Sequence, residues 1–279
     1  MKKIGFIDYY LDEWHANNYP QMIKDAAGDQ LVVSYAYAEI DSPKGGLTTD
    51  QWCEKYGVER VNSIDELIEK SDCLIVLSPD NPERHLHLTE KPLASGKLTY
   101  VDKTFATSKA MAEAIVKNAV DHNTPFFSTS ALRFANELKG FKKEGINFVY
   151  GKGPGIFEIY TIHQLEPIVI LMGSDVQRVM FIGSKTAPSF LIEFAGGRTA
   201  TIALFNDGRV DFSFGIGYDD GSFGVINSMT DYFPNFIKQL CDFFVTGNVK
   251  ADYHETIAIM GIIEAAYKAR EKPLEWINI

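Results

Sequence analysis

The feature that most constrains the fold is an alternation of short apolar runs and helix-forming stretches over the first 125 residues. The apolar runs have the length and content of buried strands, and they lie at 3–7, 30–38, 72–78, 97–103 and 124–131. The stretches with helical signals lie at 49–57, 62–71, 83–95 and 107–123. Because strand–helix–strand crossovers are right-handed and lay helices over a sheet, we predict a doubly wound parallel sheet.

Two residue patterns sharpen the expected helix boundaries. Ser63 and Glu66 have the spacing of a capping box, which marks the start of the helix at 62–71. Pro20 lies in the stretch after the first strand, where it should either break a helix or open a second one at its first turn. We therefore expect an interruption near Pro20 and a clean helix start at Ser63.

Beyond residue 125, strand-like runs follow one another with few helices between them. The runs are INFVYG, IFEIYTI, QRVMFIG, SFLIEFAGG, RTATIALFN, VDFSFGIGY and GSFGVI. Two helices, each with an apolar face, close the chain at 231–247 and 254–271. We predict an α/β fold with a first domain at 1–125 and an α+β domain at 126–279 that holds an open, largely antiparallel sheet. The apolar open face of that sheet favours a homo-oligomer.

The charge and cysteine content argue against several classes of partner. The chain has 27 basic and 37 acidic side chains and a net charge of −10, which disfavours nucleic acid and anionic membranes because both attract clustered positive charge. No apolar run approaches the length of a membrane span, and the first residues lack a signal-peptide pattern. Cys53, Cys73 and Cys241 match neither a metal site nor a disulfide framework, so we expect a cytoplasmic protein without a metal.

Four segments match a known family in their order and spacing. They are EKYGVERVNSIDELIEKSDCLIVLSP…H…ASGKLTYVDKTFA, STSALRF, IYTIHQLEPIVILMG and the ending CDFFVTG…HETIAIMGIIEAAYKARE. Over nearly its whole length the chain resembles the glucose–fructose oxidoreductase / inositol dehydrogenase family (Gfo/Idh/MocA). The resemblance implies a Rossmann domain at 1–125 that binds NAD or NADP and a substrate and oligomerisation domain at 126–279. It also implies hydride transfer between that cofactor and a sugar, polyol or related hydroxy or carbonyl compound.

Two lysines compete for the role of the family's catalytic lysine. Lys91 stands in a Glu-Lys-Pro sequence but in the middle of a helix-forming stretch, so we expect a solvated surface lysine. Lys103 ends a strand, and ligands of doubly wound sheets bind outside the carboxyl ends of the strands. The family's spacing from His85 and Gly96 also selects Lys103. We therefore predict that Lys103 hydrogen-bonds the reacting oxygen and shares a cleft with His163.

The resemblance assigns roles to the residues around this lysine. His163 would be the general acid or base on the reacting hydroxyl or carbonyl, and Asp102 would help set Lys103. Arg133 and Tyr160 would contact the substrate, with a structural salt bridge as the competing interpretation of Arg133. A small-molecule substrate is thus the expected partner.

The catalytic segment departs from the family motif Asp-x-Gly-x-His. The segment IYTIH keeps the histidine, His163, but has Ile159 in place of the aspartate. Glu158 comes one residue too early, and on a strand it would point to the opposite face.

The turn that should hold the cofactor also departs from the family. The family has G-x-G-x-x-G, whereas this chain has DYYLDE, with Asp8, Tyr10 and Glu13 at the glycine positions and Asp12 between them. One like-charge pair at about 4 Å costs roughly 4 kcal/mol at an effective dielectric near 20. A helix N-terminus offers a charge only about 0.3–1 kcal/mol. Carboxylates that faced the pyrophosphate would therefore weaken cofactor binding.

The residues expected to line the cofactor come from this turn and from the strand ends. They are Asp8, Tyr9, Tyr10, Leu11, Tyr35, Ser78, Pro79, His85, Asp102 and Lys103. Tyr35 could stack on the adenine or merely cover the sheet edge. His85 could line the nicotinamide side of the cleft or start a helix without touching anything, and His15 is interpreted as structural.

Two functions from different classes follow. The retained Lys103, His163 and Arg133 favour an NAD(P)-dependent oxidoreductase with an unusual cofactor turn. The lost glycines and the lost aspartate favour a non-catalytic protein on the same fold that binds a small molecule or a partner.

Overall fold

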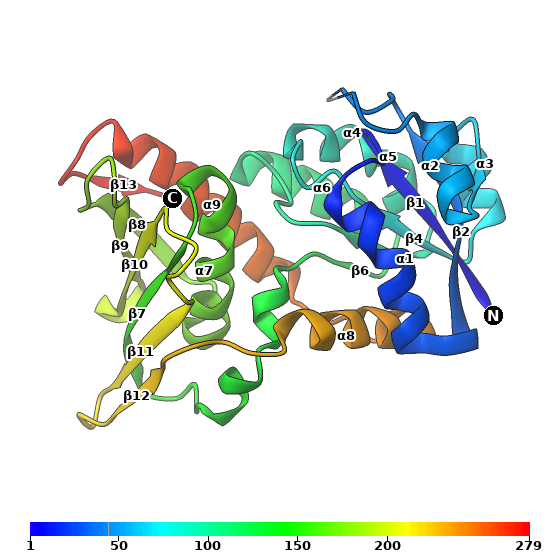
Figure 1. The fold of residues 1–279 in the computed structure, drawn as a ribbon. Helices are drawn as coiled ribbons and strands as arrows, with labels where there is room; N and C mark the ends of the chain where they lie inside the picture. The colour runs from blue at the N-terminus through cyan, green and yellow to red at the C-terminus, as the bar shows by residue number, and fades with distance from the viewer. Residues whose placement is uncertain (44) are drawn as a thin grey trace. The chain divides into compact units, whose positions relative to one another are not determined.

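The computed structural model describes residues 1–43 and 45–279, which form two compact units (Figure 1). Unit 1 holds Met1–Thr129 and Ile237–Tyr253, and unit 2 holds Ser130–Phe236 and His254–Ile279. The division at 125/126 stays a prediction about independently folding domains. In the packing, the chain changes unit four residues later, and the segment Ile237–Tyr253 returns to unit 1.

Unit 1 is built on a six-stranded sheet in the order β3-β2-β1-β4-β5-β6. The strands are β1 (Lys2–Asp8), β2 (Leu31–Ala38), β3 (Glu59–Arg60), β4 (Cys73–Val76), β5 (Leu98–Val101) and β6 (Phe126–Phe127). Every pairing in this sheet is parallel, which confirms the predicted doubly wound topology. The sequence missed β3, because two exposed charged residues carry no strand pattern.

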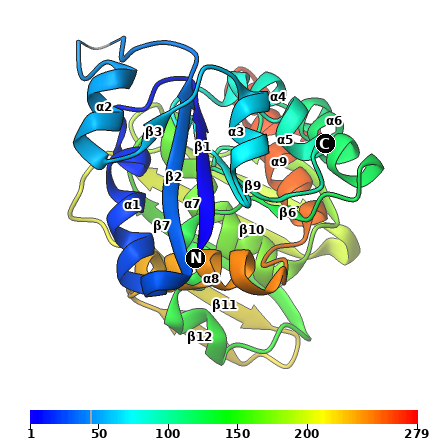
Figure 2. The same ribbon diagram turned by 90° about the vertical axis from the view of Figure 1, so that its right-hand side faces the viewer.

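The helices of unit 1 lie on both sides of this sheet, with α1 and α2 on one side and α3 on the other (Figure 2). They are α1 (Trp14–Ala27), α2 (Thr49–Tyr56), α3 (Ile64–Lys70), α4 (His85–Leu88), α5 (Glu90–Ala94) and α6 (Lys109–Asp121). Ser63 caps α3 as predicted, since its hydroxyl accepts a hydrogen bond from Glu66 N at 3.1 Å. The capping box is not complete, because the Glu66 carboxylate accepts a hydrogen bond from Asn62 N and not from Ser63 N.

The expected interruption at Pro20 is wrong, because Pro20 lies inside one continuous helix, α1. The proline removes one backbone hydrogen bond. The stripe of buried residues Ala16, Tyr19, Ile23 and Ala27 holds the helix against the sheet on either side of it.

The segment Ile237–Tyr253 joins unit 1 through packing on the sheet. It contains most of α8 (Tyr232–Thr246). The Phe243 ring meets the Phe127 ring edge-on at 5.0 Å, and Lys2 Nζ donates a hydrogen bond to Phe244 O at 2.7 Å. The aromatic contact with β6 and the hydrogen bond from the first strand thus attach the segment Ile237–Tyr253 to unit 1.

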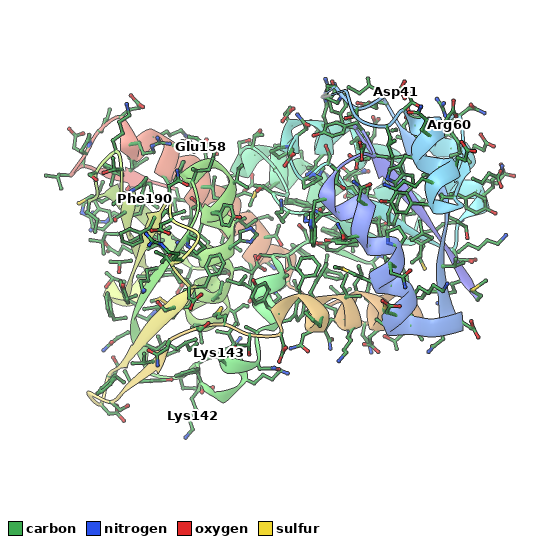
Figure 3. All side chains as sticks on the ribbon, in the orientation of Figure 1. Asp41, Arg60, Lys142, Lys143, Glu158 and Phe190 are labelled. Carbon is green, nitrogen blue, oxygen red and sulfur yellow. The ribbon has the colours of Figure 1, made fainter. Side chains whose placement is uncertain are left out.

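Unit 2 is built on a seven-stranded sheet in the order β12-β11-β7-β10-β9-β8-β13. The strands are β7 (Ile146–Pro154), β8 (Val176–Phe181), β9 (Ser189–Phe194), β10 (Thr199–Phe205), β11 (Ser213–Tyr218), β12 (Phe223–Ile226) and β13 (Trp276–Asn278). Only β7 and β10 pair in parallel, so the predicted largely antiparallel sheet is confirmed. One face of this sheet packs on helices through buried aromatic rings such as that of Phe190 (Figure 3). The centre of the Phe190 ring lies 5.2 Å from the centre of the Phe157 ring.

Two long helices, α7 (Phe157–Met172) and α9 (Tyr253–Arg270), belong mainly to unit 2. The predicted strand IFEIYTI is wrong, because this segment enters α7. The run FEIYTIHQLEPIVILM is apolar on nearly all sides, so periodicity could not separate a buried strand from a buried helix. The expectation that Glu158 points to the opposite face of a strand is therefore wrong, because Glu158 lies on a helix. No helix among the described residues is long and apolar enough to cross a membrane.

Candidate functional site

The carboxyl edge of the unit 1 sheet is where a ligand is expected, and the turn between β1 and α1 lies on it. This turn is filled by its own side chains. Tyr10, Leu11 and Glu13 are buried, with exposed fractions of 4%, 2% and 8%. A glycine turn would leave this space to the cofactor, so the local structure differs from that of a dinucleotide site.

Glu13 is the N-cap of α1, and its carboxylate occupies the start of the helix. It accepts hydrogen bonds from His15 N, at 2.7 Å, and from Ala16 N. The N–H groups at this end of a helix are those that bind phosphate groups in dinucleotide folds. Burial raises the pKa of Glu13 to about 7, and Asp102 adds to the rise, while His15 and the two N–H groups oppose it.

Asp8 ends β1 as a second buried carboxyl, with 1% of its surface exposed. Its Oδ1 accepts a hydrogen bond from Tyr9 N at 2.6 Å, whereas Oδ2 has no hydrogen-bond partner among the described residues. Burial raises the pKa of Asp8 well above its ordinary value, and the nearby charge of Glu13 raises it further. With these carboxyl groups at the turn, the residues present do not fit a dinucleotide pyrophosphate held in the usual way.

Asp12, the third acid of the turn, points away from the helix start. Its Oδ2 accepts a hydrogen bond from Leu47 N at 2.8 Å, and its Oδ1 accepts one from Asn17 Nδ2 at 3.0 Å. Asn17 Oδ1 in turn accepts from Trp52 Nε1 at 2.8 Å. Asp12 thus fastens the 45–47 loop to α1, and only Asp8 and Glu13 bear on the question of the cofactor.

Lys103 follows the end of β5, and Asp102 beside it is almost completely buried. Asp102 Oδ1 accepts hydrogen bonds from Lys103 N at 2.8 Å and from Tyr100 OH at 3.2 Å, while Oδ2 pairs with His15 Nδ1. Burial works to raise the pKa of Asp102, but His15 and Lys103 outweigh burial and hold that pKa below its ordinary value. The His15 ring stacks on Tyr19 with ring centres 5.1 Å apart.

Lys91 lies on the exposed surface of α5, as predicted. Its side chain is 55% exposed and pairs with Asp65, which is 68% exposed. Lys103 remains the candidate for a working lysine.

His85 starts α4, as one interpretation had it, but it is completely buried and contacts two carbonyl groups instead of touching nothing. Its ring nitrogens contact Leu77 O at 2.5 Å and Phe105 O at 3.0 Å. Burial lowers the pKa of His85, and the two carbonyl groups oppose that shift. The histidine ties the residue after β4 to a residue after β5, which is a structural role.

Tyr35 turns away from the carboxyl edge of the sheet. Its hydroxyl accepts a hydrogen bond from Lys3 Nζ at 3.0 Å, and Lys3 stands at the start of β1, at the amino end of the strands. Lys70 Nζ also lies 5.8 Å from the centre of the Tyr35 ring. These contacts favour the interpretation that Tyr35 covers the sheet.

The other residues expected at the cofactor have partners within unit 1. The Arg84 guanidinium lies 4.3 Å from the centre of the Tyr9 ring, and Tyr10 OH donates to Asp80 at 3.4 Å. Ser78, beside the half-buried Pro79, adopts a positive φ of 77° and donates a hydrogen bond to Asn81 O at 3.1 Å. Their role toward a ligand stays a prediction.

In unit 2, His163 lies on α7 with a polar and an aromatic neighbour. Its Nδ1 is 2.7 Å from Ser130 Oγ, and the Tyr160 ring stands edge-on to it at 5.3 Å. Tyr160 packs over Gly155, where a Cβ would come within 2.2 Å of the ring. His163 and Tyr160, the expected acid or base and an expected substrate contact, thus lie one turn apart on the helix.

Arg133 is held by two carboxylates of its own unit. Its Nε pairs with Glu166 at 2.8 Å and its Nη2 with Glu255 at 2.7 Å, and 10% of its side chain is exposed. These contacts favour the structural salt bridge over a contact with substrate. The sequence did not identify the two glutamates, because they are far from Arg133 along the chain.

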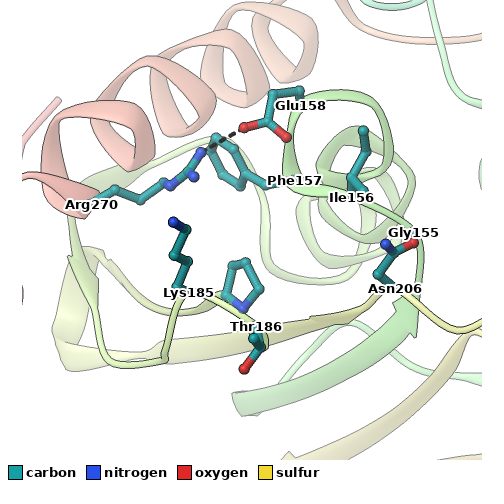
Figure 4. A pocket seen from close by; sticks show the side chains of 9 residues that line it. Gly155, Ile156, Phe157, Glu158, Lys185, Thr186, Asn206 and Arg270 are labelled. Atoms are coloured by element: carbon teal, nitrogen blue, oxygen red, sulfur yellow. Dashed lines mark hydrogen bonds and ion pairs between the residues drawn. The ribbon is translucent and has the colours of Figure 1, made fainter.

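A pocket of about 400 Å³ opens beside the start of α7 (Figure 4). Its charged and amide-bearing lining residues are Glu158, Lys185, Asn206 and Arg270, and Arg270 pairs with Glu158 at 2.8 Å. Glu158 and His163 lie five residues apart, which separates them by roughly 140° around a helix. The pocket is therefore on a different face of α7 from His163. The sequence missed it, because loops and helix ends with no shared motif supply its residues.

Among the described residues, no group of three or more His, Cys, Asp or Glu side chains is placed to hold a metal ion.

The chain shares its fold with solved oxidoreductase structures. A probable dehydrogenase from Thermotoga maritima is 16% identical, with a TM-score of 0.78 over 99% of this chain and 98% of that one. Scyllo-inositol dehydrogenase from Lactobacillus casei, with bound NAD(H) and scyllo-inositol, is 14% identical, with a TM-score of 0.77 over 99% and 98% of the two chains. The resemblance to the inositol dehydrogenase family is therefore confirmed at the level of the fold.

The same fold also hosts another chemistry. Biliverdin reductase from Synechocystis sp. PCC 6803, in complex with biliverdin and NADP+, is 12% identical, with a TM-score of 0.69 over 96% of this chain and 98% of that one. No protein-family model and no curated protein matches the sequence. At these identities the likeness establishes the architecture, and the function must be argued from the site.

Proposed function

We propose that this chain binds a sugar- or polyol-like small molecule without holding a nicotinamide dinucleotide at the β1–α1 turn. The observation that carries the proposal is the hydrogen bonding of the Glu13 carboxylate to His15 N and Ala16 N. A pyrophosphate would have to displace this carboxylate and then lie beside the buried Asp8. The ligand class is supported by the solved neighbour that contains scyllo-inositol.

A second candidate function is an NAD(P)-dependent oxidoreductase acting on a sugar, polyol or related compound. It is favoured by the retention of polar groups at the positions where the family has its acid and base. Lys103 lies beside the buried Asp102, and His163 lies beside Ser130. Under this alternative Lys103 would stabilise negative charge on the reacting oxygen, and His163 would carry its proton.

Titration with NADH and NADPH tests the proposal. Cofactor fluorescence should show no saturable binding up to about 1 mM, the weak end of useful affinities. In the same preparation, thermal unfolding in the presence of inositols and other polyols should reveal a ligand that raises Tm, because a ligand of the folded state stabilises it. A micromolar Kd for either cofactor, together with cofactor-dependent turnover of a polyol, would overturn the proposal in favour of the oxidoreductase.

We also propose that the protein is located in the cytoplasm. Cys53, Cys73 and Cys241 are buried free thiols, which suits a reducing cytoplasm.

A further inference from the structure

His15 has one ring nitrogen bound to a buried carboxylate, and among the described residues of unit 1 no hydrogen bond is made to the other. Nδ1 pairs with Asp102, whose side chain is 1% exposed, while 12% of the histidine side chain is exposed. Nε2 makes no hydrogen bond to the described residues of unit 1. A carboxylate that accepts from Nδ1–H fixes the tautomer in which Nε2 carries a lone pair, and that nitrogen can act as a general base.

Asp102 is held firmly enough to set this tautomer. Its other oxygen accepts hydrogen bonds from Lys103 N and Tyr100 OH, at 2.8 and 3.2 Å. The Tyr19 ring stacks on His15 and limits its rotation. The pair is therefore fixed from both sides, at the carboxyl edge where ligands of this fold bind.

Lys103 brings a positive charge to the same place. Its backbone is bonded to Asp102, and its charge helps to hold the pKa of Asp102 below the ordinary value. An ammonium group beside a general base can stabilise an oxyanion that forms when the base removes a proton.

We propose that His15, Asp102 and Lys103 form a proton-transfer site that acts on the carbon next to the carbonyl group of a hydroxy-carbonyl compound. His15 Nε2 takes the proton from that carbon, the C–H electron pair forms a C=C bond, and the carbonyl π electrons move onto the oxygen. Lys103 stabilises the resulting enolate oxygen. The imidazolium returns a proton to the carbon, so no oxidant, reductant or dinucleotide is consumed.

This inference deepens the proposed function and rests on it, because the site is available only if a dinucleotide does not cover the turn. Asp102 acts as a positioning residue through His15. His15 and Lys103 would touch the reacting atoms and are the catalytic residues of the proposed step.

Hydrogen–deuterium exchange next to a carbonyl tests the step. The protein is incubated in D₂O with a ketoinositol, dihydroxyacetone and fructose, and loss of the C–H signal is followed by proton NMR. We expect exchange above the buffer rate for at least one probe. His15→Gln should lower it by about 10²–10⁴-fold, the usual contribution of a general acid or base. Lys103→Met should lower it by about 10²–10³-fold.

Exposed residues of the same types supply matched controls. His87→Gln and Lys91→Met change a histidine and a lysine whose side chains are 66% and 55% exposed, and both should keep the wild-type exchange rate. Circular dichroism establishes that each variant is folded.

A measurement without substrate tests the role of Asp102. Nitrogen-15 NMR of the His15 ring should show the proton on Nδ1 in the wild type, and Asp102→Asn should move the tautomer population toward Nε2–H. Absence of exchange with all three probes, or full exchange by His15→Gln, would overturn the proposal. Failure of exchange leaves the cofactor titration unaffected, so the proposed function and this inference can fail separately.

Discussion

Replacing Glu13 by serine should allow the chain to bind a dinucleotide more tightly. Serine is a good N-cap residue, so Glu13→Ser keeps a side-chain acceptor for the start of α1 while it removes the carboxylate. The Glu13 oxygens lie within hydrogen-bonding distance of His15 N and Ala16 N, so a phosphate bound to the same N–H groups would come within about 4 Å of them.

The expected gain follows from the two charges. A like-charge pair at about 4 Å costs roughly 4 kcal/mol at an effective dielectric of about 20. The attraction of the helix N-terminus for a phosphate, at most about 1 kcal/mol, is present in both proteins and does not change the comparison. Removing the repulsion of about 4 kcal/mol corresponds to roughly a thousandfold lower Kd.

NADH titration at pH 8, where Glu13 is mostly ionised, is the assay. Asp12→Asn is the matched control, because this neighbouring carboxylate is bonded to Leu47 N and Asn17 Nδ2 and should not affect NADH. Equal or weaker NADH binding by Glu13→Ser would refute the account of the turn, and so would tightening by Asp12→Asn.

Three further predictions concern stability and assembly. Burial raises the pKa of Glu13 from 4.5 to about 7, so the folded state binds this proton more tightly than the unfolded state, and stability falls as the pH rises from about 4.5 to above 7. Glu13→Gln should reduce this fall by at most about 3 kcal/mol, measured by urea denaturation between pH 5 and pH 8. An unchanged pH profile of stability would contradict the raised pKa of Glu13. Arg133→Ala leaves the buried Glu166 and the partly buried Glu255 without their cation. It should lower the free energy of unfolding by about 3–5 kcal/mol, whereas a loss below about 1 kcal/mol would show that the group is not a structural ion pair. Phe223 and Val225 are 79% and 56% exposed on β12, so we expect a homo-oligomer by light scattering that Phe223→Asp dissociates; a monomeric wild type would refute this.

The sequence predicted the sheets well where strands repeat a regular apolar pattern. Five of the six parallel strands of unit 1 follow from buried runs such as the one that becomes β4, while the two-residue β3 lacked any such run. α7 was mistaken for a strand because a helix buried on most sides has no polar face to reveal its period.

The sequence could predict a site residue only where its position at the end of a strand shows that it lies at the ligand-binding edge of the sheet. Lys103 was preferred over Lys91 because it ends a strand, and the exposed position of Lys91 agrees with that choice. The pairing of His15 with Asp102 joins residues 87 positions apart, and no local pattern could reveal it. The ion pair of Arg133 with Glu255 also joins residues far apart in the sequence, so it could not be predicted. The hydrogen bonds of the Glu13 carboxylate to the first N–H groups of α1 depend on the local backbone conformation, which the sequence pattern does not specify.

A crystal structure of the protein grown at pH 8 with excess NAD+ would show whether the β1–α1 turn can hold a dinucleotide. We expect no dinucleotide at this turn, with the Glu13 carboxylate still bonded to His15 N and Ala16 N. A pyrophosphate bound to the first turn of α1, with Glu13 rotated away from it, would contradict the account.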